Sequence, residues 1–241
     1  MVARRLDKLK KLQEELREWA KVEIHVINVD LSKESERLRL QQKICGEMKL
    51  NIDVLVNNAG STTYGLNSQV CWEDQKTQID LNVMALVHLT KIFLPSMLSR
   101  GFGYIIQVAS ITAYAASPYY GVYCATKSFV LSYTESLHEE LKGTGVKALC
   151  VCPGPINTDF FAHSGQQSLK IHKDSMVEPD FVSRATVDKM FESKSGSFIP
   201  DWYNTLAIFL VTTFLPRSFL TWMAGQLSKP EETHTKNDAK N

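Results

Sequence analysis

The stretch Val54-Leu55-Val56, followed at once by Asn57-Asn58-Ala59-Gly60, decides the fold of this chain. Three consecutive apolar residues are typical of a short strand that is buried on both faces, as in parallel sheets. The small residues that follow predict a turn in which the backbone can approach a bound molecule closely. An ordinary turn would have the same composition. The sequence therefore predicts a buried strand that ends at a candidate binding edge.

Similar strands alternate with helices along the rest of the chain. We expect further strands at residues 24–29, 104–108 and 146–152, and a last short strand near Phe198. Helical periodicity or capping predicts helices at residues 6–19, 32–48, 72–100, 120–142 and 178–193. This alternation predicts an α/β fold with a doubly wound, parallel, Rossmann-like sheet.

Composition excludes several classes of function. The chain has 241 residues, enough for one well-packed domain, and its 27 Lys and Arg residues nearly cancel its 26 Asp and Glu residues. The basic surface expected of a nucleic-acid-binding protein is therefore missing. The five cysteines contain no Cys-x-x-Cys pair, and the six histidines have no metal-ligand spacing. We expect a reducing compartment, the cytoplasm, and no catalytic metal.

The chain reads as one domain with a polar tail. No internal repeat or linker divides residues 1–227, whereas residues 228–241 have too few apolar side chains to form a core and are predicted to be disordered. Residues 1–21 interleave charge with apolar residues, unlike a signal peptide. The longest apolar stretch, residues 205–215, is shorter than the ~20 residues of a spanning helix. We expect it to pack against the domain or a partner subunit, and contact of residues 205–223 with a membrane surface stays open.

A tyrosine and a lysine one helical turn apart form a candidate catalytic pair. Tyr123 and Lys127 lie in the expected helix 120–142, and positions i and i+4 share one helix face. A nearby ammonium favours the phenolate, so Lys127 is expected to lower the pKa of Tyr123, ordinarily ~10, toward neutrality. Tyrosine and lysine are common enough here that one such pair can arise by chance, so other residues must support it.

Two further polar residues are predicted to lie near this pair. Ser110 follows the apolar strand 104–108 and so falls at its carboxyl end, where open α/β sheets bind ligands. Asn82 lies inside an apolar helical stretch, where an amide without a buried role is unfavourable. The ordinary interpretations are a strand-ending serine, with Ser117 as the nearest alternative hydroxyl, and a surface asparagine.

These motifs together resemble the short-chain dehydrogenase/reductase (SDR) family, classical type. The order Asn57-Asn58-Ala59-Gly60, Asn82, Ser110 and Tyr123-x-x-x-Lys127 carries the resemblance, which covers residues 4 to about 199. It implies that Tyr123 is the general acid/base and that Ser110 orients the substrate carbonyl. It also implies that Lys127 tunes the tyrosine and binds the cofactor ribose, while Asn82 holds a proton-relaying water.

The same resemblance implies a nicotinamide dinucleotide cofactor. The positions that match the family's cofactor site are Arg4, Arg5, Asp30, Leu31, Asn58, Ala59, Gly60, Tyr123, Lys127, Pro153, Gly154, Ile156 and Thr158. Pro155 is a small departure in the Pro-Gly turn that surrounds the nicotinamide. Because a guanidinium pairs with a 2′-phosphate, Arg4 and Arg5 favour NADP(H) over NAD(H). Two solvated charges at a helix start are the alternative.

The function implied is an NADP(H)-dependent oxidoreductase that interconverts a carbonyl and a secondary alcohol. The aromatic residues Phe160, Phe161, Trp202 and Tyr203 hint at a lipophilic small-molecule substrate. The family resemblance further implies a homodimer or homotetramer. No nucleic-acid partner is expected.

The chain departs from the family pattern at its start. The family's first strand and its Thr-Gly-x-x-x-Gly-x-Gly turn, which holds the cofactor pyrophosphate at a helix N-terminus, have no counterpart before Asp30. We therefore expect an N-terminally truncated form of the fold that lacks this strand and turn and binds NADPH weakly. The alternative is a non-catalytic Rossmann-like protein with an interaction or regulatory role.

Overall fold

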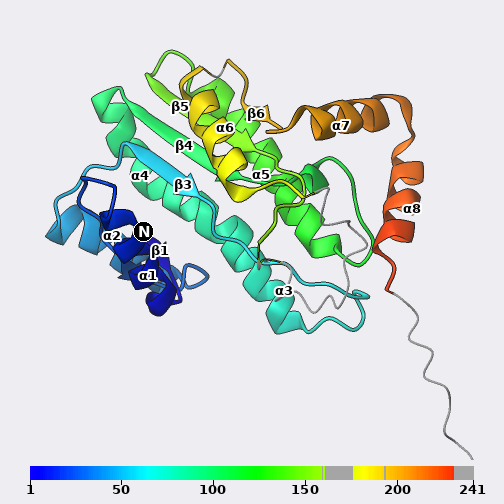
Figure 1. Ribbon diagram of the computed structural model, residues 1–241, viewed down its shortest axis with the longest axis horizontal. Coiled ribbons are helices and arrows are strands. Elements are labelled where there is room, and N and C mark those ends of the chain that lie inside the picture. Colours follow the sequence, from blue (N-terminus) through cyan, green and yellow to red (C-terminus); the bar gives the residue numbers. More distant parts are fainter. Residues whose placement is uncertain (159, 161–175, 193, 231–241) are drawn as a thin grey trace, which may run out of the picture.

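A four-stranded parallel sheet forms the centre of the molecule (Figure 1). The computed structural model describes residues 1–158, 160, 176–192 and 194–230. In spatial order the strands are β3 (Val54–Asn57), β4 (Gly103–Val108), β5 (Val146–Val151) and β6 (Ser197–Phe198). On β4, Ile105 lies between Leu55 of β3 and Ala148 of β5. The α/β fold expected from the alternating elements is confirmed.

Helices cover both faces of this sheet. On one face, Ile105 and Ala148 pack against Met97 of α4 (Leu86–Arg100) and Leu137 of α5 (Gly121–Glu140). On the other face, Leu149 contacts Met190 of α6 (Pro179–Glu192). Neighbouring strand residues thus point to opposite faces, as the pleat of a strand requires.

A second, two-stranded parallel sheet lies near the N-terminus, on the β3 side of the molecule (Figure 1). It pairs β1 (Val2–Ala3) with β2 (Ile27–Asn28), and α1 (Leu6–Arg17) connects the two strands. Next along the chain come α2 (Glu34–Gln41) and a π-helical turn, η1 (Gln42–Glu47). Ile27 and Leu40 pack with Phe93 of α4, so one apolar cluster joins these elements to the main sheet.

Three expectations about these elements need correction. The strand expected at residues 24–29 is limited to Ile27–Asn28, because its partner β1 has only two residues. The helix expected to be capped by Ser32 begins at Glu34, because the hydroxyl and backbone N–H of Ser32 donate instead to Asp30 Oδ1, at 2.7 and 3.2 Å. The strand 54–56 is not buried on both faces, since Val54 and Val56 are 43% and 56% exposed. In the part of the chain described, no other strand pairs with the second edge of β3.

The helix predicted at residues 72–100 is one continuous helical stretch with a wider turn inside it. It comprises α3 (Trp72–Ile79), the π-helical turn η2 (Asp80–Ala85) and α4. By length and composition alone this stretch could cross a membrane. Its residues Leu89, Phe93 and Met97 are nevertheless buried in the clusters beneath the sheets, and we therefore assign it as a core helix.

The last two helices lie at the periphery (Figure 1). They are α7 (Trp202–Phe214) and α8 (Arg217–Ser228). Helix α7 has no buried residue, so residues 205–215 do not pack into the core of the domain, and packing against a partner subunit stays a prediction. Helix α8 continues one residue into the segment predicted to be disordered from residue 228, and residues 231–241 of that tail lie outside the described part.

Candidate active site

The residues predicted to be catalytic lie near the carboxyl ends of β3, β4 and β5, apart from the predicted adenosine-side residues of the N-terminal sheet. Ser110 follows β4 and begins a 3-10 turn, η3 (Ile111–Ala113), in which its Oγ accepts the Thr112 N–H at 3.2 Å. The backbone N–H of Ile111 donates to the Pro153 carbonyl at 3.0 Å, which ties the loop after β4 to the loop after β5. The serine is therefore held at the edge of the sheet where α/β proteins bind ligands.

Tyr123 and Lys127 occupy the face of α5 that is turned toward this edge. The Tyr123 side chain is hydrogen-bonded to Ser110. Lys127 donates from Nζ to the carbonyl of Val108, the last residue of β4, at 2.7 Å, and Nζ lies 5.7 Å from the centre of the Tyr123 ring. Both side chains are buried. The structure thus brings the predicted serine, tyrosine and lysine into one cluster.

The electrostatics of this cluster differ from the expectation for Tyr123. Burial raises the pKa of the phenol, and the hydrogen bond to Ser110 only partly opposes that shift. Lys127 is itself buried, and desolvation lowers its pKa to about 8. Because burial dominates, the pKa of Tyr123 is raised and is not brought down toward neutrality as predicted.

Asn82 joins the turn after β3 to the catalytic helix. It lies in η2 and is 2% exposed, so it is not a surface asparagine. Its Oδ1 accepts the Ser61 N–H and its Nδ2 donates to the Ser61 carbonyl, both at 2.9 Å. Nδ2 also lies 3.1 Å from Thr126 Oγ1, which in turn donates to the Tyr123 carbonyl at 2.8 Å. Sequence reasoning missed Ser61 and Thr126; the only signal was the position of Thr126 directly before Lys127.

The Asn57–Gly60 turn places a glycine beside the lysine. Asn57 is buried and its Nδ2 lies 3.3 Å from Thr90 Oγ1, which anchors the turn on α4. A Cβ at Gly60 would stand 3.3 Å from Asn82 Oδ1 and 3.7 Å from Lys127 Nζ. Glycine therefore keeps open the space between these two polar groups, while Asn58 and Ala59 are exposed.

The Pro-Gly turn after β5 lies under the start of α7. A Cβ at Gly154 would come within 2.4 Å of Asn204 Nδ2, so the backbone and the amide approach closely. Asp201 holds that amide, since its Oδ1 accepts the Asn204 N–H at 2.7 Å and its Oδ2 accepts from Nδ2 at 3.0 Å. Ile156 forms a parallel bridge with Val177, and Thr158 is exposed.

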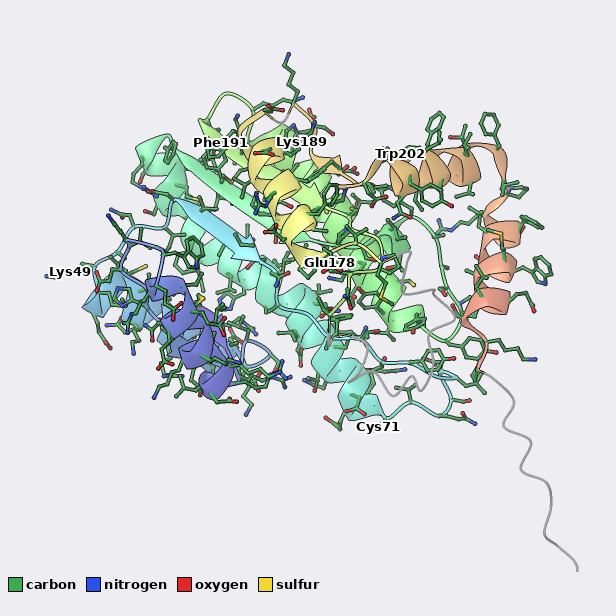
Figure 2. The ribbon with its side chains drawn as sticks, in the orientation of Figure 1. Lys49, Cys71, Glu178, Lys189, Phe191 and Trp202 are labelled. Atoms are coloured by element: carbon green, nitrogen blue, oxygen red, sulfur yellow. The ribbon has the colours of Figure 1, made fainter. Side chains whose placement is uncertain are left out.

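The aromatic residues proposed to contact substrate are only partly brought together. The Phe160 ring centre lies 5.9 Å from that of Tyr123. Trp202 and Tyr203 are 77% and 67% exposed, and Figure 2 shows Trp202 on the peripheral helix α7. Phe161 lies outside the described residues. Of the three that the structure describes, only Phe160 therefore lies beside Tyr123.

The predicted adenosine-side residues lie in the N-terminal sheet. Partial burial would raise the pKa of Asp30, but hydrogen bonds from Ser32 and the positive charge of Arg4 lower it overall. Arg4 and Arg5 are exposed where β1 leads into α1, whereas the Leu31 side chain is buried. Sequence reasoning did not include Arg37, which contacts this segment. Arg37 is 4% exposed and donates a hydrogen bond to the Leu31 carbonyl at 2.7 Å.

The buried charge of Lys127 has a testable cost. A fall from the ordinary pKa of 10.5 to about 8 corresponds to roughly 3 kcal/mol of destabilisation. Loss of the hydrogen bond to Val108 would offset about 1 kcal/mol of the gain from removing the charge. We therefore expect Lys127→Met to raise the free energy of unfolding at about pH 7 by roughly 1–2 kcal/mol, as measured by urea denaturation.

The pH dependence of this effect has a definite sign. Below about pH 8 both folded and unfolded states carry the Lys127 charge, so the full cost is present. Between about pH 8 and the unfolded value of 10.5 the folded state releases its proton first, and the wild type gains stability relative to the variant. The exposed Lys91→Met is the control and should show no such trend. A stability difference that does not change with pH would contradict the buried charge.

The fold and this cluster define a Rossmann-like α/β scaffold with a Ser–Tyr–Lys cluster at the edge of its sheet. Residues 1–169 match the family model described as short chain dehydrogenase. The chain belongs to this family.

Named dehydrogenases with similar sequences agree with the assignment of the chain to this family. The chain is 30% identical over 201 residues to 17-beta-hydroxysteroid dehydrogenase 13 of Rattus norvegicus, covering 82% of this chain and 64% of the relative. It is 29% identical over 212 residues to estradiol 17-beta-dehydrogenase 11 of Homo sapiens, covering 85% and 67%. The chain thus spans just under two thirds of the length of the first of these relatives.

Two solved structures share the fold. One, from work on the stereoselectivity of 7beta-hydroxysteroid dehydrogenase, superposes with a TM-score of 0.82 at 23% identity over 93% of this chain and 85% of the other. The other is a short-chain dehydrogenase from Sphingobium yanoikuyae in complex with NADPH, with a TM-score of 0.75 at 24% identity over 89% and 85%. At these identities the likeness establishes the architecture.

Proposed function

We propose that this protein is an NADP(H)-dependent oxidoreductase that interconverts a carbonyl and a secondary alcohol on a lipophilic substrate. The observation that carries the proposal is the Ser110–Tyr123 hydrogen bond beside the buried Lys127, at the carboxyl edge of a parallel sheet. Membership of the short chain dehydrogenase family supports the reaction class. Similarity to hydroxysteroid dehydrogenases supports a lipophilic substrate.

The roles of the side chains follow from their geometry and protonation. Burial raises the pKa of Tyr123, so the phenol keeps its proton at neutral pH and is able to donate it to a substrate oxygen. Ser110 shares a hydrogen bond with that phenol and can orient the same oxygen. Lys127 Nζ lies 5.7 Å from the centre of the Tyr123 ring, which places the lysine beside the tyrosine to bind the cofactor ribose, as the family resemblance implies.

The residues that would hold the cofactor fit an elongated dinucleotide at its two ends. Gly60, Lys127 and the Pro153-Gly154 turn border the catalytic cluster, and Arg4 and Asp30 lie together in the N-terminal sheet. When bound, NADP(H) supplies or accepts the hydride. The chain's own part is to bind it, to position the substrate oxygen and to exchange the proton at Tyr123 Oη. Asn82 positions this machinery by holding Ser61 and Thr126.

The proposal is tested by the consumption of NADPH by the purified protein with a panel of aliphatic, aromatic and steroidal ketones. A rate that saturates with ketone and is absent without protein supports it. No rate with any ketone, and no oxidation of the corresponding alcohols with NADP⁺, would overturn it in favour of a non-catalytic, interaction or regulatory role.

Cofactor choice gives a separate prediction. A guanidinium pairs with a 2′-phosphate through charge-assisted hydrogen bonds of about 1.5–3 kcal/mol. Replacing Arg4 and Arg5 together with Ala should therefore weaken NADPH binding by roughly ten-fold to one-hundred-fold while leaving NADH binding nearly unchanged, as measured by fluorescence titration.

A matched control separates this effect from net charge. Lys10→Ala with Lys21→Ala removes two exposed positive charges from the same N-terminal region. Equal loss of NADPH and NADH affinity in the arginine variant, or an equal NADPH loss in the lysine variant, would contradict a phosphate contact.

A further inference from the structure

Helices α7 and α8 expose apolar side chains to solvent. The exposed fraction is 58% for Phe209 and 71% for Phe214 on α7, and 59% for Trp222 on α8. In Figure 2 α7 and α8 carry side chains on the side that is turned away from the sheet as well as on the side that faces it. An apolar surface of this kind on a folded domain marks an interaction site.

The exposed residues of α7 lie on one side of the helix. Trp202, Leu206, Phe209 and Leu210 recur at spacings of three, four and eight residues, which places them on a common face at 3.6 residues per turn. The less exposed residues Asn204, Ala207, Ile208 and Val211 face the other way. Three of these four inward residues are also apolar, so α7 is apolar on both sides, with its largest aromatic and leucine side chains outward.

The charge and length of the pair favour a lipid surface as the occupant of this face. Between Asp201 and Lys229 the only side chain charged at neutral pH is Arg217, which is exposed in the first turn of α8. The helices have 13 and 12 residues, about 20 and 18 Å, whereas the hydrocarbon core of a bilayer is ~30 Å thick. Helices this short and uncharged, with tryptophan and tyrosine at the start of the first, can lie in the interface but cannot cross it.

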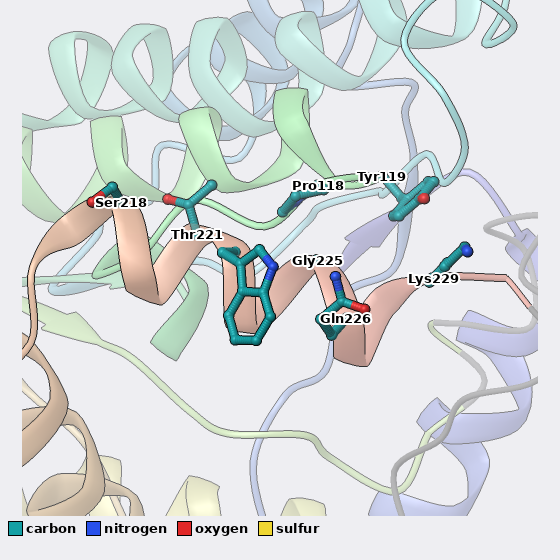
Figure 3. A pocket seen from close by; sticks show the side chains of 8 residues that line it. Pro118, Tyr119, Ser218, Thr221, Gly225, Gln226 and Lys229 are labelled. Atoms are coloured by element: carbon teal, nitrogen blue, oxygen red, sulfur yellow. The ribbon is translucent and has the colours of Figure 1, made fainter.

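Both ends of the helix pair are attached to loops of the candidate active site. At the start of α7, Asn204 rests on the Gly154 turn. At the end of α8, the Ser228 carbonyl accepts from the Tyr64 hydroxyl at 2.7 Å, and the hydroxyls of Ser228 and Ser117 lie 2.9 Å apart. The inner side of α8 borders a groove of about 500 Å³ whose opposite wall is Pro118 and Tyr119 (Figure 3).

We propose that the outward faces of α7 and α8 dock the protein on a lipid bilayer, with both helices lying in the plane of the interface. Docking would bring the Pro118–Tyr119 groove, four residues before Tyr123, close to the membrane surface. That the groove serves a substrate rests on the proposed function, whereas docking itself does not and is measured without any assay of activity.

The test is flotation of the full chain with vesicles of phosphatidylcholine. The wild type is expected to float with the vesicles, and the triple variant Leu206→Ser, Phe209→Ser, Phe214→Ser should lower the bound fraction by roughly ten-fold or more. The control replaces Leu38, Phe181 and Phe191 with Ser, because these side chains are similarly exposed but lie on other helices. The control should float like the wild type.

Tryptophan fluorescence locates the contact. The chain has four tryptophans, so Trp19→Phe with Trp72→Phe leaves Trp202 and Trp222 as the only indoles. Their emission should shift to the blue on adding vesicles and be quenched by lipids brominated on the acyl chains. Adding phosphatidylserine should strengthen binding by roughly five-fold, and Arg217→Gln should remove that gain.

Other occupants of the surface produce different results. If the wild type stays out of the vesicle fraction and its indoles do not shift, the bilayer proposal is overturned. A lipid-free dimer that the triple variant dissociates, combined with absence of flotation, would assign the surface to a second copy of this chain. Equal loss of flotation in the triple variant and in the control would also reject the proposal, because the binding would then have no specific site.

Discussion

Tyr123→Phe is expected to lower the turnover number for carbonyl reduction by roughly 10²–10⁴-fold while leaving NADPH affinity nearly unchanged. The variant removes one oxygen atom, the one that is hydrogen-bonded to Ser110 and carries the transferable proton. The ring and its contact with the Phe160 ring remain, so the fold should be retained. Initial rates with the best ketone and NADPH titration measure the two quantities.

The matched control for this prediction lies on the same helix. Tyr133→Phe also removes one phenol oxygen from α5, but Tyr133 stacks on Phe129, 5.9 Å between ring centres, away from the catalytic cluster. Its turnover number should stay close to the wild-type value. Near wild-type turnover in the Tyr123 variant would refute the role of general acid, and an equal loss in both variants would point to a general disturbance of the helix.

Gly145→Ala is expected to destabilise the protein by more than about 4 kcal/mol, the largest stability effect we predict. Gly145 has φ +82°, and a Cβ there would stand 1.9 Å from the Gly101 carbonyl oxygen. Gly145 directly precedes β5 and Gly101 lies two residues before the start of β4, and the first residues of these paired strands, Gly103 and Val146, are opposite each other. The two backbones must therefore touch for the sheet to pair in register, and a side chain at Gly145 forces them apart.

Gly143→Ala separates this steric effect from the cost of backbone conformation. Gly143 has a similar φ of +79°, but nothing lies within 4 Å of its virtual Cβ. The Gly143→Ala substitution should therefore lower the free energy of unfolding only by the cost of a left-handed backbone conformation, about 1–2 kcal/mol. Urea denaturation of both variants gives the comparison. If Gly145→Ala were no more destabilising than Gly143→Ala, the close approach to Gly101 would not be a constraint on the fold.

The parts of the site that follow local rules were predictable from the chain alone. Tyr123 and Lys127 share a helix face because they are four residues apart, and Ser110 sits at a carboxyl end because it follows an apolar strand. The order of strands and helices likewise led to a parallel α/β sheet. In each case the determining interaction spans only a few residues.

Properties that depend on distant segments were not predictable in this way. The pKa of Tyr123 is raised rather than lowered, because other parts of the chain bury the phenol and exclude water from it. The partners of Asn82, Ser61 and Thr126, are separated from it by 21 and 44 residues. No periodicity in the sequence relates residues so far apart.

By itself, the sequence determined which residues share a face or a strand end, and hence the fold class and the candidate catalytic cluster. The tertiary structure alone decided what covers each face. The apolar residues Val54 and Val56 are exposed although their strand has the composition of a buried one, and α7 leaves large apolar side chains such as Phe209 exposed. The physical reason is that hydrophobicity is a property of a side chain, whereas burial depends on which other segments pack against it.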